Sequence, residues 1–152
     1  MKNVVVVDAS IAIKWVLEEP DSDVAETLLA EWSNNGILIL APSLLAYEIT
    51  NALHRKVRKG EITLDRAKEA LVELSLAEID FDFSTDFALS TRAIELANHF
   101  SFPATYDSHY LALAERKGCE LWTADLRMWN SIGGKLAWVH WLGEYSIPNK
   151  ES

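Results

Sequence analysis

The sequence predicts an α/β domain with a mainly parallel central sheet and helices on both of its faces. Short apolar stretches alternate along the whole chain with longer segments of helical spacing. Some of these stretches are continuously apolar, as in Val4–Val7, which is typical of parallel strands buried on both faces. With 152 residues and no repeat, linker or low-complexity tract, the chain is expected to form a single domain over residues 1–145, followed by a polar tail at 146–152.

The first elements are predicted from their composition and from the signals that end them. Val4–Val7 is β-branched and stops at Asp8, which indicates a buried strand. Residues 10–17 have helical spacing and stop before Pro20. A second helix is expected to start at Asp21-Ser22 and to run to about Trp32, closed by the turn signal that ends at Gly36.

The middle of the chain repeats the alternation of strand and helix. Residues 37–40 form an apolar strand, and Pro42 with Ser43 opens a helix that runs to Lys59 and ends at Gly60. Residues 63–76 keep helical spacing. Residues 78–83 alternate apolar and acidic side chains with period two, which indicates a strand.

The last third follows the same pattern. A helix is expected from Ser84 to about Phe100, and Pro103 separates it from a second helix at 105–117 that Gly118 closes. The remaining predicted elements are a strand at 121–123, a short helix at 125–130 and a strand at 137–140.

Four acidic residues stand where such a fold would bring side chains together. Asp8 and Asp125 follow apolar strands, and Glu48 and Asp107 lie in helical patterns just after loops that contain proline. Functional groups in an open parallel sheet gather at the carboxyl ends of the strands. At an effective dielectric of ~20, two carboxylates about 4 Å apart repel by roughly 4 kcal/mol, so such a cluster implies a divalent cation. Oxygen ligands favour Mg²⁺ or Mn²⁺.

Each of these acids also has an ordinary structural explanation. Asp8 would serve as a helix N-cap, and Asp107 lies in a first helical turn, where the helix dipole favours an anion. Glu48 would simply be an exposed acid on a helix, with Asn51 on the same face three residues later. Ser10 can cap the helix or hydrogen-bond the site.

The net charge of −9, from 14 basic and 23 acidic residues, argues against a nucleic-acid partner. Two features weaken that argument. Acids that bind cations reverse the local sign. Basic residues also concentrate at 55–59, as either a phosphate-binding rim or the favourable C-terminus of a helix. The six tryptophans would fill a core or a dimer interface, or would stack on bases, with Trp15 the first candidate for stacking.

The compartment is inferred from what the sequence lacks. Cys119 is the only cysteine, so no intrachain disulfide is possible. The first residues lack the pattern of a secretory signal, and no apolar run approaches the ~20 residues of a membrane span. We therefore expect a cytoplasmic protein that does not enter the membrane.

Taken together, the segments resemble the PIN-domain family of metal-dependent nucleases, and most closely the VapC-like toxins of toxin–antitoxin pairs. The resemblance spans roughly residues 3–142. The matching motifs are Val7-Asp8-Ala9-Ser10, Pro42-Ser43-Leu44 with Glu48 and Asn51, Tyr106-Asp107 with Tyr110-Leu111-Ala112-Leu113-Ala114, and Thr123-Ala124-Asp125.

The resemblance implies a site and an activity. It assigns Asp8, Glu48, Asp107 and Asp125 to a catalytic centre that binds Mg²⁺ or Mn²⁺, with Ser10, Asn51 and Thr123 as polar residues that support it. It implies an endoribonuclease that hydrolyses phosphodiester bonds of single-stranded or looped RNA and leaves a 5′-phosphate. It also implies a homodimer and a VapB-like antitoxin, whose C-terminal segment we expect in a groove formed by residues 11–17 and 44–53.

Two other classes of protein are alternatives to a nuclease. A phosphatase of the haloacid-dehalogenase type needs a second aspartate two residues after the first, and this chain has Ser10 there. A catalytically inert PIN-like module that binds RNA or protein remains the alternative, although all the acids are present. A DNA-cutting relative would usually be longer and carry additional acids.

Overall fold

The strands form one five-stranded sheet in the order β3-β2-β1-β4-β5, and every neighbouring pair is parallel. This computed structural model describes residues 3–84 and 86–145. The strands are β1 (Val4–Val7), β2 (Leu38–Pro42), β3 (Ile79–Asp82), β4 (Glu120–Thr123) and β5 (Val139–Trp141). The predicted α/β fold with a parallel sheet is confirmed.

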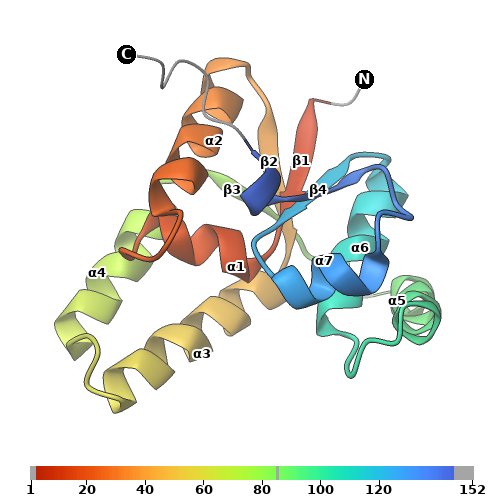
Figure 1. The fold of residues 1–152 in the computed structure, drawn as a ribbon. Helices are drawn as coiled ribbons and strands as arrows, with labels where there is room; N and C mark the ends of the chain where they lie inside the picture. The colour runs from red at the N-terminus through yellow and green to blue at the C-terminus, as the bar shows by residue number, and fades with distance from the viewer. Residues whose placement is uncertain (1–2, 85, 146–152) are drawn as a thin grey trace.

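The helices cover both faces of the sheet, with α2 on one face and α6 with α5 on the other (Figure 1). α3 and α4 pack together and project to one side. The helices are α1 (Ala9–Ala12), α2 (Ser22–Asn34), α3 (Leu44–Arg58), α4 (Leu64–Ser75), α5 (Phe87–His99), α6 (Tyr106–Lys117) and α7 (Leu126–Ile132), with single 3₁₀ turns η1 (Ile13–Trp15) and η2 (Leu142–Glu144).

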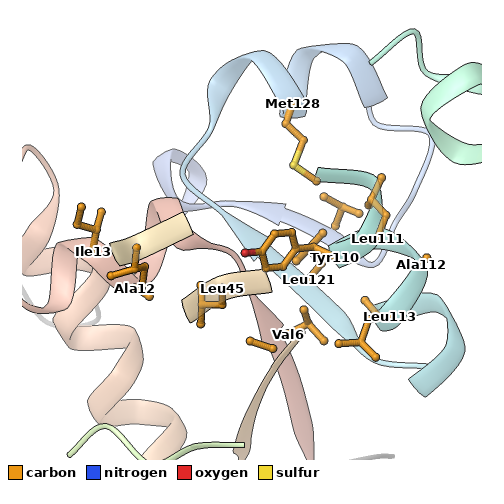
Figure 2. Close-up of a cluster of buried hydrophobic side chains, with 14 of the residues drawn as sticks. Val6, Ala12, Ile13, Leu45, Tyr110, Leu111, Ala112, Leu113, Leu121 and Met128 are labelled. Atoms are coloured by element: carbon orange, nitrogen blue, oxygen red, sulfur yellow. The ribbon is translucent and has the colours of Figure 1, made fainter. Parts of the chain in front are cut away.

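Alternate valines of β1 explain why both faces are covered. Val5 and Val7 pack into a cluster with Leu28 and Trp32 of α2. Val6 points to the other face and belongs to the larger core cluster that includes Tyr110. Figure 2 shows this larger core, into which side chains of α6 point. The uninterrupted apolar run therefore reflects a strand buried on both faces.

The predicted elements are all present, with shifted ends. The helix predicted at 10–17 is shorter: α1 begins at Ala9 and passes into the tighter turn η1. The helix predicted from Ser84 begins at Phe87, because the carboxylate of Asp86 caps it. The turn η2 was not predicted. The predicted tail at 146–152 lies outside the described residues, so the domain boundary stays a prediction.

The strand order fixes where a site can form. β1 lies in the middle of the sheet, with β2 on one side and β4 on the other. From β1 the chain adds β2 and β3 on one side, and it then adds β4 and β5 on the other side. Ligands of open parallel sheets bind in the crevice where the strand order changes direction in this way, here between β1 and β4. Asp8 and Asp125 follow these two strands. Among the described helices, none combines the length and apolar character needed to cross a membrane.

Candidate functional site

Asp8 sits at the carboxyl end of β1 and is 4% exposed. It caps α1, because its Oδ1 accepts a hydrogen bond of 3.3 Å from the amide of Ile11. The ordinary N-cap explanation is therefore true, but it is incomplete. The hydroxyl of Ser10 donates to Oδ1 at 2.5 Å, and the hydroxyl of Thr123 donates to Oδ2 at 2.5 Å. Asp8 is therefore held by groups from α1 and from the end of β4.

The two hydroxyls also join the ends of β1 and β4. Ser10 Oγ accepts a hydrogen bond of 2.8 Å from the amide of Ala124. Thr123 Oγ1 accepts one of 3.0 Å from the amide of Asp125. Each hydroxyl thus connects the Asp8 carboxylate to the backbone that leads to the next acid. Ser10 and Thr123 lie where the sequence predicted them, beside the acidic residues.

Asp125 begins α7 and acts as its N-cap. Its Oδ1 accepts hydrogen bonds from the amides of Arg127 (2.9 Å) and Met128 (3.3 Å). These bonds fix the direction of the carboxylate at the end of β4. Asp125 lies at this end of the sheet because it follows Thr123, the last residue of β4, by two residues.

Glu48 reaches the same region from α3, and Tyr110 of α6 meets it there. The Tyr110 hydroxyl donates a hydrogen bond of 2.5 Å to Glu48 Oε1. Burial, and after it the bond to Glu48, raises the pKa of Tyr110 far above its ordinary value, so the phenol keeps its proton. The other oxygen, Oε2, accepts no hydrogen bond from a residue that the structure describes.

Asp107 interacts electrostatically with Glu48 and Asp125, and its carboxylate lacks hydrogen bonds of the kind that the other acids receive. No described residue donates one to its carboxylate. Burial raises the pKa of Asp107 to about 6, and repulsion from Asp125 and Glu48 adds to the effect, while Arg127 opposes it. Of the four carboxylates, the half-buried one of Asp107 has its negative charge stabilised least by the described residues.

Burial also raises the pKa of Asp8, to about 7. The hydrogen bonds from Ser10 and Thr123 act in the opposite direction, and the charge of Asp107 raises the value further. Asp107 therefore interacts electrostatically with the three other acids, which come from three separate segments of the chain. The fold thus brings the four predicted acids into one electrostatic site.

The site's donor chemistry suits a hard divalent cation, although the ligands are not gathered around one point. Within residues 3–84 and 86–145, no three His, Cys, Asp or Glu side chains lie close enough together to enclose an ion. The fit rests on the mutual repulsion of the carboxylates and on Asp107, whose carboxylate accepts no hydrogen bond from a described residue. Carboxylate oxygens of this kind are ligands for Mg²⁺ and Mn²⁺.

Other predicted features lie away from this arrangement. Asn51 is exposed, and its side chain makes no hydrogen bond with a described residue. Trp15 donates to the carbonyl of Ala25 at 2.9 Å and packs edge-on against Trp32, so it fills the core. The basic run at 55–59 includes the last turn of α3, as the helix-terminus explanation requires.

Tyr110 is the site residue that sequence reasoning missed. It was quoted only as part of a motif, because an aromatic residue in an apolar run is typical of core. A signal was nevertheless present: Tyr110 follows Asp107 by three residues, so both lie on one side of α6. Arg127 was also missed, two residues after Asp125.

Comparison with known proteins shows the family of the chain. The PIN domain family matches residues 5–134, which include all four acids. Ribonuclease VapC3 from Pyrobaculum aerophilum is 30% identical over 128 residues, which cover 81% of this chain and 90% of that protein. The chain belongs to the PIN-domain family and is of the VapC type.

Proposed function

We propose that this chain is a metal-dependent endoribonuclease that hydrolyses RNA phosphodiester bonds. The observation that carries the proposal is the electrostatic contact of Asp107 with Asp8, Glu48 and Asp125, at the carboxyl edge of a parallel sheet. Membership of the PIN-domain family and the likeness to a protein named as a ribonuclease support the same activity.

In this proposal the four carboxylates hold Mg²⁺ or Mn²⁺. A divalent cation bound there would lower the pKa of its water and stabilise charge on the phosphoryl oxygens. The chain's own residues prepare the site: Ser10 and Thr123 fix Asp8, and the N-cap bonds fix Asp125. Arg127 is exposed beside Asp107 and offers a positive charge to an incoming phosphate.

The substrate within this proposal is single-stranded or looped RNA, cut to leave a 5′-phosphate. Purified protein would be incubated with labelled RNA and labelled DNA, in Mn²⁺ or in EDTA. We expect cleavage of RNA in Mn²⁺ alone, and at least a 100-fold loss in Asp8→Asn, since an electrostatic catalytic group is commonly worth that much. The matched control is Asp80→Asn, which alters an exposed aspartate of β3.

Full cleavage in EDTA, or by Asp8→Asn, would remove the metal-dependent mechanism. Binding of RNA without cleavage under any condition would favour the inert module instead.

The proposal includes the role of a toxin held inactive by a VapB-like antitoxin, in a cytoplasmic homodimer. The negative charge of −9 favours a basic partner. An arginine of that partner would pair with the carboxylate cluster. Sedimentation that shows only a monomer at micromolar concentration would contradict the homodimer.

The predicted position of the antitoxin segment, in a groove formed by residues 11–17 and 44–53, stays a prediction. Ile11, Leu45 and Ile49 are completely buried in the protein's own core, while Tyr47 of α3 is 73% exposed. Exposed apolar side chains also lie on α4, where Val72 is 64% and Leu76, just after the helix, 76% exposed. A cavity of about 310 Å³ lies between α3 and α4 and is lined in part by Ala46, Thr50, Leu71 and Leu74. We propose that the antitoxin segment lies against α3 and α4.

A further inference from the structure

We infer that Tyr110 is a positioning residue of the acidic site, whose hydroxyl holds the Glu48 carboxylate in place for the cation. The inference rests on the proposed function, and it adds a residue that acts through another. Tyr110 is not placed among the ligands, because its phenol hydroxyl donates a hydrogen bond of 2.5 Å to Glu48 Oε1.

The first argument is the contrast between Glu48 and the acids that start helices. Asp8 and Asp125 are fixed by backbone amides of their own helices. Glu48 lies in the interior of α3, whose amides bond within the helix, so no such donor is available to it. A long, flexible side chain in that position needs a donor from elsewhere. Among the residues that the structure describes, Tyr110 is the one that provides it.

The second argument is the rigidity of the donor. Tyr110 is 1% exposed, and its ring is packed in the larger core cluster. Figure 2 shows the ring among the buried core side chains, with its oxygen directed away from α6. The ring that carries the hydroxyl is therefore held in place by the core that α3, α6 and the sheet share. A donor held this way orients its acceptor more strictly than an exposed side chain can.

The third argument is the set of charges around the hydroxyl. The hydroxyl contacts Glu48 directly, and the carboxylates of Asp8 and Asp107 also interact electrostatically with the phenol of Tyr110. It ties up only Oε1 of Glu48 and leaves Oε2 without a described donor. A phenol has a single proton to donate. The bond thus fixes one oxygen and leaves the other open to a ligand.

The experiment measures Mn²⁺ binding by calorimetry, without RNA, for the wild type and for Tyr110→Phe. The phenylalanine ring keeps the core filled, and circular dichroism with thermal unfolding in EDTA checks that the fold is kept. We expect the Kd for Mn²⁺ to rise by about 10-fold or more, as is usual when a group that orients a ligand is removed. Raising Mn²⁺ should then restore most of the RNA cleavage.

The matched control is Tyr145→Phe. Tyr145 donates a bond of 2.6 Å to Glu31, so this variant removes the same kind of bond away from the acidic site. Its Kd for Mn²⁺ should equal that of the wild type. In a Glu48→Gln background, adding Tyr110→Phe should change the Kd little, because the two changes affect one interaction.

The outcomes separate this inference from the proposed function. A wild-type protein that binds Mn²⁺ and a Tyr110→Phe variant that binds it equally well would overturn the inference alone. A lower unfolding midpoint with an unchanged Kd would also overturn it, since Tyr110 would then be purely structural. A wild-type protein that binds no Mn²⁺ would overturn both.

Discussion

At the scale of single residues, Asp8 combines two roles that pull against each other. It caps α1, which stabilises the fold, and it is a buried carboxylate whose pKa is shifted by no basic side chain of the described residues. Burial raises its pKa from the ordinary 3.8 to about 7. A carboxylate that is costly to ionise in the folded protein is useful only if its charge has a function.

This predicts how stability depends on pH when no divalent cation is present. The folded state binds the proton of Asp8 more tightly than the unfolded state, so the stabilisation is complete below about pH 4 and is lost as pH rises through about 7. The pKa change, from 3.8 to about 7, corresponds to roughly 4 kcal/mol. In EDTA, the free energy of unfolding should fall across this window, and Asp107 adds to the fall.

Asp8→Asn removes the titrating group and should flatten this dependence, so that the variant is more stable than the wild type at pH 8. Urea unfolding at several pH values measures it, with Asp80→Asn as the control. Equal pH profiles for the wild type and Asp8→Asn would contradict the assignment of the raised pKa to Asp8.

At the scale of elements, the sequence predicted the order of strands and helices because its signals are local. Four consecutive valines, the proline before α3 and the glycine after α6 each act within a few residues. The ends shifted where a nearby side chain competed. Asp86 rather than Ser84 starts α5, because its carboxylate reaches the amide of Leu89 at 2.8 Å.

The site was predictable to the extent that it too is local. Ser10 and Thr123 could be found because each lies two residues from an acid. The partner of Glu48 could not be found, because Tyr110 is 62 residues away and lies in an apolar stretch that is typical of a core helix. Asn51 satisfies the motif and the helical spacing, yet it faces solvent. Sequence spacing identifies a face of a helix but not what that face meets.

The two functions of Asp125 can be separated at the start of α7. Asparagine caps a helix about as well as aspartate does, so Asp125→Asn should leave the free energy of unfolding nearly unchanged. Asp125→Ala removes the bonds to the amides of Arg127 and Met128 and should destabilise the protein by about 1 kcal/mol. Both variants should lose RNA cleavage, because both remove the charge.

Urea unfolding and a cleavage assay in Mn²⁺, run on the same preparations, test this separation. Cleavage retained by Asp125→Asn would mean that Asp125 acts only as a cap, and it would reduce the proposed metal ligands to three.

At the scale of the whole molecule, charge and apolar surface are distributed in a way that suits a regulated enzyme. The acids that repel one another gather at one edge of the sheet, while the net charge of −9 makes the protein a poor ligand for free RNA. A basic partner would be attracted by the same charge. Exposed apolar side chains on α4 offer such a partner an apolar contact close to α3, which carries Glu48.

The last prediction tests that partner. The chain would be co-expressed with the product of an adjacent small reading frame, and the two should co-purify as an inactive complex. Val72→Asp places a charge on the exposed face of α4 without touching the core, since Val72 is 64% exposed. It should leave folding and RNA cleavage unchanged but abolish co-purification, because a charge within an apolar contact is left unpaired. Ile94→Asp, at a position 61% exposed on α5, is the control that should keep the partner. A complex that survives Val72→Asp would move the docking face away from α4, whereas a partner lost equally from both variants would show only that added charge weakens the complex.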